Sequence, residues 1–222
     1  MEGDAAHHLG RVLRAQTGQL YELSDGQRVC LARIEKVSRD RVDFTLLEEI
    51  PAYLPRVEVT LLLSVVKFDA FEWAIEKATE LGVSTIVPLA AARSETALLA
   101  AAGKRAERWK KMLAEASQQS RRVRVPALES VARPAVAWSR QSAATKILLS
   151  ERPEAPPLRQ VLTTAFAPSA ALAIGPEGGW TDEEVAAAQK AGFREASLGK
   201  LILRTETAVI TALASLNFAL SD

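Results

Sequence analysis

The sequence predicts an α/β protein in which a helix-covered parallel sheet follows a small N-terminal β-barrel, with the domain boundary after residue 53. Short alternating strands between residues 20 and 50 predict the barrel. From residue 57 onwards, apolar strands alternate with amphipathic helices, a pattern typical of a parallel sheet. Two glycine-containing bends in the last third of the chain each lie between a strand and a helix. We therefore expect a ligand site at the carboxyl edge of that sheet.

Length and composition limit the classes of protein to which the chain can belong. It has 222 residues, 48% of them apolar, which is enough for one large or two modest domains with a proper core. No apolar run reaches the roughly 18 residues of a membrane-spanning helix, and acidic residues 1–4 lack the apolar segment of a signal peptide. Cys30 is the only cysteine, which rules out an internal disulfide and favours a reducing, cytoplasmic location.

The N-terminal segment contains two features that bear on function. His7 and His8 are not accompanied by a cluster of Cys, His or carboxylate side chains, so we expect no metal site. Arg11 and Arg14 are predicted to lie on one face of a short helical turn.

The strands of the first domain are recognised by alternation and by turn residues. The pair Asp25-Gly26 predicts a hairpin turn between two such strands. Cys30 lies in the second of them, where we expect it to act as a buried small hydrophobe. Pro51 and Pro55 bracket a predicted hinge, because proline ends strands and resists helix formation.

The second domain begins with a strand–helix–strand unit. Residues 57–66 form a long apolar strand that is predicted to be buried on both faces, as strands of parallel sheets are. A helix is predicted to begin at Asp69, whose side chain caps it, and to end at Gly82. Residues 83–88 form the next strand, which completes the first parallel pair.

An amphipathic helix over residues 104–119 lies within the main concentration of positive charge. Between residues 93 and 124 there are nine Lys and Arg but only three Glu, although the net charge of the chain is only +1. Residues 1–66 hold eight Lys and Arg against ten Asp and Glu. The basic segment, together with Arg11 and Arg14, is therefore predicted to contact a phosphate backbone, rather than the barrel strands. The alternative is a solvated helix face without a ligand.

The first glycine bend follows an apolar strand over residues 170–174. Pro176 ends the strand, and Gly178 and Gly179 allow a ligand to approach the backbone closely. Thr181 and Glu184 predict a capping box at the start of the next helix. The Rossmann and phosphate-loop glycine patterns are both missing, so a strained turn without a ligand is the alternative for this loop taken alone.

The second bend lies about twenty residues later, with Gly199 at its turn and with Arg204 and Glu206 beside the start of a helix. These two charged residues could also form only a surface pair. The helix itself, residues 205–220, is nearly all apolar and must therefore be buried on all sides. A second copy of the chain would cover it; a central position in the core is the alternative.

Taken together, the words GPEGGWT and LGKLILRTETA resemble the signature of the ribosomal RNA small subunit methyltransferase E family. These SPOUT methyltransferases methylate N3 of a uridine in 16S ribosomal RNA. HLGRVLR near the N-terminus and EASQQSRR after the basic helix extend the resemblance over most of the chain. The sequence departs from the family at Phe68 and Arg121, where glycine is common.

The resemblance implies a PUA-like N-terminal barrel and a trefoil knot over about residues 145–222. It also implies S-adenosylmethionine as cofactor, a homodimer, 16S rRNA or the small ribosomal subunit as partner, and no metal or membrane. The implied RNA-binding residues are Arg11, Arg14, Lys67, Arg121 and Arg122. The implied cofactor-binding residues are Leu149, Ser150, Glu151, Ile174, Gly175, Pro176, Glu177, Gly178, Gly179, Leu198, Gly199, Ile202 and Leu203.

In the implied reaction, glycines leave space for the cofactor, and the target uridine is unpaired because N3 lies on its Watson–Crick edge. Arg204 is expected to stabilise the uracil anion, and Glu206 or Glu177 to accept the N3 proton. A purely structural role of Glu206 at the helix start is the alternative. A binding-only ribosome assembly factor, or a knotted methyltransferase acting on a ribose oxygen or another base, are the alternative functions.

Overall fold

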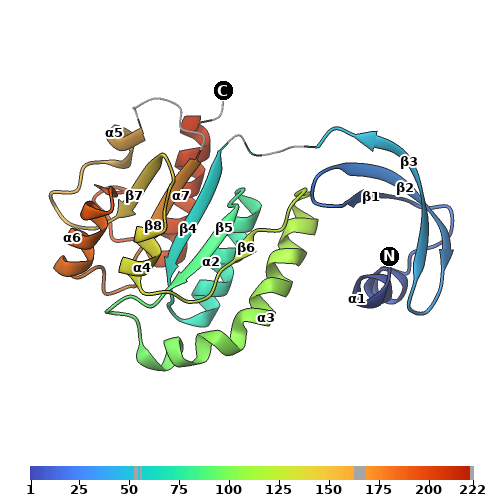
Figure 1. The fold of residues 1–222 in the computed structure, drawn as a ribbon, viewed down its shortest axis with the longest axis horizontal. Coiled ribbons are helices and arrows are strands. Elements are labelled where there is room, and N and C mark those ends of the chain that lie inside the picture. Colours follow the sequence, from blue (N-terminus) through green and yellow to red (C-terminus); the bar gives the residue numbers. More distant parts are fainter. Residues whose placement is uncertain (53–54, 56, 163–168, 221–222) are drawn as a thin grey trace. The chain divides into compact units, whose positions relative to one another are not determined.

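The computed structural model describes residues 1–52, 55, 57–162 and 169–220, apart from the side chains of Asp4 and Leu220 (Figure 1). The chain divides into two compact units, Met1–Leu54 and Pro55–Asp222. The predicted boundary after residue 53 falls outside the described residues, as do residues 163–168 and 221–222 of the segment expected to be knotted.

The first unit is built on an antiparallel sheet in the order β1-β2-β3. Its elements are α1 (Gly3–His7), the π-helix η1 (His8–Val12), β1 (Leu20–Ser24), β2 (Val29–Val37) and β3 (Val42–Ile50). The predicted Asp25-Gly26 hairpin is confirmed, with the Asp25 carboxylate accepting hydrogen bonds from the backbone N–H groups of Gln27 and Arg28. These bonds lower the pKa of Asp25 to about 2.

Two predictions for this unit need correction. Arg14 does not share a helical turn with Arg11, because η1 ends at Val12 and Arg14 has a left-handed backbone with φ of 51°. The Ala15 N–H instead reaches back to the Leu9 carbonyl, which turns the chain out of the helix. Cys30 is half-buried rather than buried.

The second unit contains a six-stranded sheet in the order β6-β5-β4-β8-β7-β9, and every pair is parallel. This confirms the predicted fold class. The strands are β4 (Glu58–Ser64), β5 (Thr85–Leu89), β6 (Ala127–Leu128), β7 (Thr145–Leu149), β8 (Ser169–Ile174) and β9 (Arg194–Ala196). The helices are α2 (Phe68–Glu80), α3 (Thr96–Gln119), α4 (Pro134–Ser139), α5 (Leu158–Leu162), α6 (Asp182–Lys190) and α7 (Thr205–Leu220).

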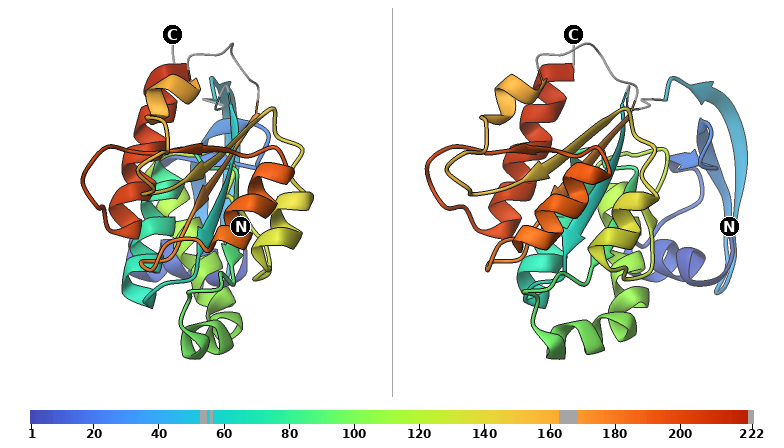
Figure 2. Two further views of the ribbon diagram at one scale, coloured as in Figure 1. Left: turned by 90° about the vertical axis from the view of Figure 1, so that its left-hand side faces the viewer. Right: turned by 60° about the vertical axis from the view of Figure 1, so that its left-hand side comes forward.

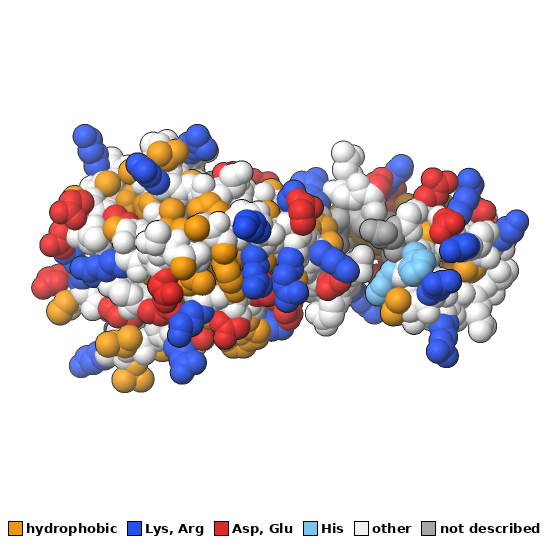
Figure 3. All heavy atoms as spheres, turned by 90° about the horizontal axis from the view of Figure 1, so that it is seen from below, with side chains coloured by type: hydrophobic (Ala, Val, Ile, Leu, Met, Phe, Trp, Pro, Cys, Tyr) orange, Lys and Arg blue, Asp and Glu red, His pale blue; other side chains and the backbone are white. Residues whose placement is uncertain are grey.

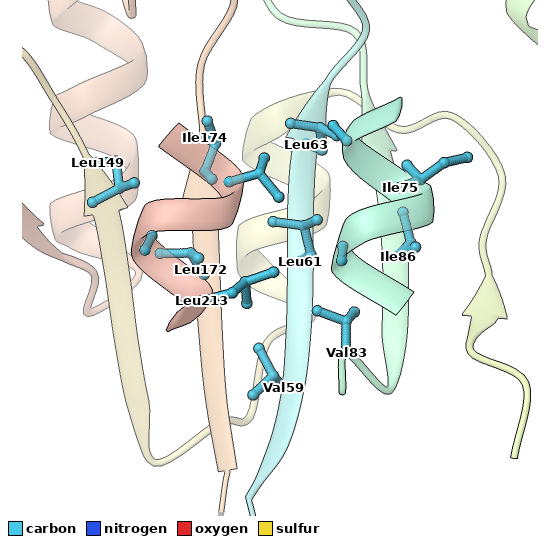
Figure 4. Close-up of a cluster of buried hydrophobic side chains, with 14 of the residues drawn as sticks. Val59, Leu61, Leu63, Ile75, Val83, Ile86, Leu149, Leu172, Ile174 and Leu213 are labelled. Carbon is cyan, nitrogen blue, oxygen red and sulfur yellow. The ribbon is translucent and has the colours of Figure 1, made fainter. Parts of the chain in front are cut away.

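Helices cover both faces of this sheet, with α2 and α7 on one side and α4 and α6 on the other (Figure 2). Successive residues of β4 serve the two sides in turn: Leu61 and Leu63 face the α2/α7 side, and Leu62 faces the α4/α6 side. Figure 4 shows side chains of β4, β8, α2 and α7 meeting in the first of these cores. The prediction that the first strand is buried on both faces is therefore confirmed.

Two helix starts differ from the prediction. Helix α2 begins at Phe68 with Lys67 in the cap position, so Asp69 lies inside the first turn and is not the cap. Helix α3 begins at Thr96, eight residues earlier than predicted, because the Ala- and Leu-rich residues 97–102 have high helix propensity. That alanine-rich segment carries no amphipathic charge pattern, so the pattern of the sequence predicts only the later part of the helix.

Helix α7 is buried along one face within the single chain. Val209, Ala212 and Leu213 are fully buried. Phe218, in contrast, is 87% exposed, and Ala214 is exposed as well. The expected burial on all sides is thus not met by the chain on its own, and an apolar stripe of α7 remains open.

Helices α2 and α3 are joined by a buried carboxylate. Glu72 accepts hydrogen bonds from Arg105 at 2.8 Å, from Arg108 at 3.1 Å and from the Trp109 indole at 3.2 Å. The Arg105 guanidinium also lies 4.3 Å from the centroid of the Phe68 ring. Two of the basic residues expected to face RNA therefore neutralise a buried acid.

We expect Glu72→Gln to lower the free energy of unfolding by about 1–2 kcal/mol at about pH 7. Burial tends to raise the pKa of Glu72, but hydrogen bonds from Arg108, Arg105 and Trp109 outweigh it, so the pKa lies below the ordinary 4.5. The contribution is therefore complete above pH 4.5 and disappears as the pH falls through the lowered pKa.

Urea denaturation of both proteins at falling pH measures this effect. The matched control is Glu107→Gln on α3, whose side chain is 85% exposed and pairs with Lys110. It is expected to change stability by less than about 0.5 kcal/mol. A wild-type advantage over Glu72→Gln that grows in acid would contradict the assignment.

Candidate active site

Three loops leave the carboxyl ends of three neighbouring strands in the sheet order β8-β7-β9. The 175–181 loop follows β8, the 150–157 loop follows β7 and the 197–204 loop follows β9. Because all three strands are parallel, their carboxyl ends lie at the same edge of the sheet. The two glycine bends singled out in the sequence are therefore brought to one edge.

The 150–157 and 197–204 loops are joined by backbone hydrogen bonds. The Ser197 N–H donates to the Pro156 carbonyl, and the Leu158 N–H donates to the Ser197 carbonyl, both at 2.8 Å. The Ser150 N–H donates to the Ala196 carbonyl at 2.9 Å. These bonds occupy the N–H group of Ser150, one of the expected cofactor-binding residues, and fix the two loops as a pair.

Trp180 ties the 175–181 loop to β7. Its indole N–H donates to the Leu149 carbonyl at 2.9 Å, and its ring makes an edge contact with Trp138 at a centroid distance of 5.6 Å. A Cβ atom on Gly175 would lie 3.1 Å from the Trp180 ring. A side chain at residue 175 would therefore crowd the Trp180 ring, which gives a packing reason for a glycine at this position.

The predicted capping box is confirmed at the start of α6. The Glu184 N–H donates to the Thr181 hydroxyl, and the Thr181 N–H donates to the Glu184 carboxylate at 2.9 Å. The other carboxylate oxygen of Glu184 accepts from the Ala92 N–H at 2.8 Å. One side chain thus fixes both the helix start and the 90–95 loop, which follows β5.

Two arginines contact the 175–181 loop or the helix after it. The Arg93 guanidinium donates to the Gly178 carbonyl at 2.6 Å, and Arg152 from the 150–157 loop pairs with Asp182 of α6. The pKa of Glu183 is lowered by hydrogen bonds from its own backbone N–H and from Thr181, with a smaller electrostatic contribution from Arg93. Positive charge therefore lies close to this loop.

The 197–204 loop presents an open apolar surface. Gly199 has a φ of +134°, and an added Cβ there would meet no atom within 4 Å. Leu201 is 81% exposed and Ile202 is 82% exposed. A flat apolar group could therefore lie against Gly199 and the exposed Leu201 and Ile202 side chains. The side chains of Ile174 and Leu149, two other expected cofactor-binding residues, are instead buried in the core.

The residues expected to act in catalysis lie at the start of α7 and in the neighbouring loop. Arg204 is exposed and directly precedes α7, and Glu206 is half-buried in its first turn. The Thr205 hydroxyl lies 3.5 Å from the Gly175 carbonyl, which brings this helix start to the 175–181 loop. Glu177, the other candidate base, is exposed in that loop.

The expected RNA-binding residues of the second unit differ in how far their side chains are exposed to solvent. Lys67 and Arg121 are exposed, and Arg121 has a left-handed backbone with φ of 54°. Arg122 is partly buried and donates to the Thr79 carbonyl at 2.7 Å, and burial lowers the pKa of its guanidinium. In Figure 3, which views the side where α3 lies in Figure 1, Lys and Arg side chains are interspersed with acidic and apolar ones.

Two simple patterns, a metal-ligand cluster and a membrane-spanning helix, are absent from the residues that the structure describes. Among them, no group of three or more His, Cys, Asp or Glu side chains is placed to hold a metal ion. Within the same residues, no helix combines the length and apolar character needed to cross a bilayer.

Comparison with known proteins identifies the family. Residues 2–47 match the RNA methyltransferase PUA domain, and residues 53–217 match the RNA methyltransferase domain. The protein named Ribosomal RNA small subunit methyltransferase E from Synechocystis is 35% identical, with 97% of this chain and 71% of the relative aligned. The chain belongs to the ribosomal RNA small subunit methyltransferase E family.

Other members of the methyltransferase E family agree with this assignment in sequence and in structure. The Bacillus subtilis relative is 31% identical over 97% of this chain and 88% of its own length. The crystal structure of the Neisseria gonorrhoeae enzyme bound to S-adenosyl methionine is 30% identical, with a TM-score of 0.89 over 98% of this chain and 90% of that one.

Three contacts of this methyltransferase E family member were missed by reasoning from sequence. Trp180 lies inside the GPEGGWT motif, which does not predict its hydrogen bond to Leu149. Arg152 lies in a proline-rich loop, and no sequence pattern there predicts its ion pair with Asp182. Arg93 was counted with the basic run expected to face phosphate, yet its guanidinium binds a loop carbonyl. Its position in the loop after β5 indicates that its side chain lies at the ligand edge of the sheet, but not which group it binds.

Proposed function

We propose that this chain uses S-adenosylmethionine to methylate N3 of a uridine in 16S ribosomal RNA, as part of the small ribosomal subunit or its precursor. Membership of the methyltransferase E family and the S-adenosyl methionine-bound Neisseria relative support the cofactor and the class of RNA. The single observation that carries the proposal is the joining of the three loops after β8, β7 and β9 at one edge of the sheet.

The residues at this edge fit S-adenosylmethionine. Gly199, Leu201 and Ile202 offer an open backbone and aliphatic surface for an adenine ring. Backbone groups of the 150–157 and 175–181 loops supply polar contacts, and we retain the thirteen cofactor-binding residues named above as the proposed set. A trefoil knot over about residues 145–222 remains part of this proposal.

The proposed chemistry assigns separate tasks to the charged side chains. S-adenosylmethionine, when bound, supplies a methyl group attached to a sulfonium. Uracil N3 carries a proton and is a weak nucleophile, so Glu206 or Glu177 accepts that proton. The charge left on the uracil carbonyl oxygens is stabilised by the Arg204 guanidinium. An unpaired uridine is required, because a base pair would cover N3.

RNA contacts are proposed for both units. The family match of residues 2–47 to a PUA domain supports Arg11 and Arg14, and the exposed Lys67 and Arg121 are the candidates in the second unit. Arg122 takes part through the segment that it anchors to Thr79. Because ribosomal subunits are assembled in the cytoplasm, we place the activity there.

Methylation of small subunits isolated from a strain lacking this protein tests the proposal. Calorimetry measures S-adenosylmethionine binding, and mass analysis of the nucleosides identifies the methylated atom. We expect 3-methyluridine. Methylation of a ribose oxygen or of another base would replace the proposed specificity, and cofactor binding without any RNA modification would favour an assembly factor.

We also propose a homodimer that covers the open stripe of α7. The apolar residues Ala214 and Phe218 lie one turn apart on this stripe, and Phe218 is 87% exposed in the single chain. Thr211 and Thr207 continue the same helical face towards the start of α7. A large aromatic side chain so exposed on an otherwise apolar helix is typical of an interface anchor.

Phe218→Asp is expected to raise the dimer dissociation constant at least about tenfold, because it would bury a carboxylate without a partner. Sedimentation equilibrium would then give a mass near the 24.0 kDa of one chain, whereas the wild type gives twice that mass. The control Val125→Asp, at a residue 52% exposed outside α7, should leave the dimer intact. A wild type that sediments as a single chain would exclude the dimer.

A further inference from the structure

We propose that Arg93 is a positioning residue that holds the 175–181 loop in its ligand-binding conformation. The inference rests on the proposed function, since it concerns the loop that binds S-adenosylmethionine there. It assigns a role to a residue of the 90–95 loop, which follows a strand outside the group β8, β7 and β9.

Arg93 engages the loop through both its head and its stem. Its guanidinium donates a 2.6 Å hydrogen bond to the Gly178 carbonyl. Its aliphatic stem occupies the place where a side chain on residue 178 would be, because a Cβ atom there would lie 3.3 Å from both Cβ and Cδ of Arg93. The lack of a side chain at Gly178 therefore makes room for the aliphatic part of Arg93, which comes from a distant part of the chain.

The hydrogen bond acts on a peptide unit that is already held from its other end. The Gly178 carbonyl and the Gly179 N–H belong to one planar peptide group. The Gly179 N–H donates to the Pro176 carbonyl at 2.8 Å, and Gly179 has a φ of +69°. With glycine on both sides, this peptide could rotate at little steric cost. Arg93 fixes the carbonyl end and so selects one of its orientations.

The 90–95 loop that carries Arg93 is itself held by hydrogen bonds to other segments. The Ala90 N–H donates to the Ala132 carbonyl, and the Ala92 N–H donates to the Glu184 carboxylate, both at 2.8 Å. Ala91 is 2% exposed, and the Ser94 N–H closes a turn onto its carbonyl. Because the backbone on both sides of Arg93 is held by these bonds, the hydrogen bond from Arg93 can hold the Gly178 carbonyl in one position.

The competing role for Arg93 is direct contact with an RNA phosphate, which its exposure would permit. The two roles predict different losses. A positioning residue for the cofactor loop changes the Kd for S-adenosylmethionine in the absence of RNA. A phosphate contact changes the KM for RNA and its salt dependence, and leaves cofactor binding alone.

The experiment compares Arg93→Ala, Arg93→Lys and wild type by calorimetry with S-adenosylmethionine and by NMR exchange of the Gly179 amide. Arg93→Ala should raise the Kd about tenfold and speed amide exchange about tenfold, because a charged donor to the loop is lost. Arg93→Lys, which retains a donor, should fall between the two. Arg140→Ala, an exposed arginine after α4, is the control and should match wild type.

Each other outcome has a distinct meaning. An Arg93→Ala protein with wild-type Kd and wild-type Gly179 exchange would overturn the inference, as would a change confined to the KM for RNA. Failure of the wild type to bind S-adenosylmethionine would refute the proposed function instead, and the exchange rate of the Gly179 amide would still decide whether Arg93 holds the loop.

Discussion

Replacing Arg204 with alanine is expected to lower kcat for RNA methylation about 10²–10³-fold, while the Kd for S-adenosylmethionine stays close to the wild-type value. Arg204 is exposed directly before α7, and its backbone carbonyl accepts from the Ala208 N–H as the helix begins. In the proposed reaction its guanidinium stabilises a charge that develops only when uracil N3 loses its proton. Multiple-turnover methylation of small subunits at saturating RNA and cofactor measures the loss in kcat.

The same assay separates the two candidate bases. Glu206→Gln and Glu177→Gln keep the size of each side chain and remove its ability to accept a proton. The variant of the true base should lose about 10²-fold or more in rate at neutral pH, and the other should lose far less. Full activity of Arg204→Ala would remove the guanidinium from the mechanism, and a large rise in the cofactor Kd would show that Arg204 binds the cofactor instead.

Most elements of the second unit could be predicted because their residues repeat at the period of one structure. In β4 the residues that face the two cores alternate along the strand, and all three of Leu61, Leu62 and Leu63 are apolar. Such a continuous apolar run is typical of a strand buried on both faces. Helix α7 matches its predicted span of 205–220, since Thr205 follows a glycine bend and nearly all of the residues after Thr207 are apolar. The capping box of Thr181 and Glu184 is a local pattern and was equally accessible.

Contacts between segments far apart in sequence could not be predicted in this way. Gly175 and Gly178 look alike as loop glycines, but one accommodates Trp180 and the other Arg93. Nothing local to Arg93 reveals that its partner is a carbonyl 85 residues away. The left-handed Arg14 was missed for the related reason that most non-glycine residues avoid that conformation, so the sequence offers no cue.

Leu213→Ala is expected to lower the free energy of unfolding by about 2–5 kcal/mol, since it removes a fully buried side chain and leaves a cavity. Leu213 is 0% exposed and packs in the core between the sheet and helices α2 and α7, where Figure 4 shows it near Leu61 and Leu172. The Asn217 amide, one turn later, donates to the Leu81 carbonyl at 2.9 Å and holds α7 against the end of α2. The helix therefore has little freedom to move inward and fill the space.

The matched control applies the same substitution to a leucine in solvent. Leu201→Ala, at a residue 81% exposed, should change stability by less than about 0.5 kcal/mol in the absence of cofactor. Guanidinium denaturation of the three proteins at one concentration gives the comparison. Because α7 begins at Thr205, beside Arg204 and the 175–181 loop, loosening its packing should also weaken S-adenosylmethionine binding. Equal stability losses in the two variants would mean that α7 does not lie in the core as described.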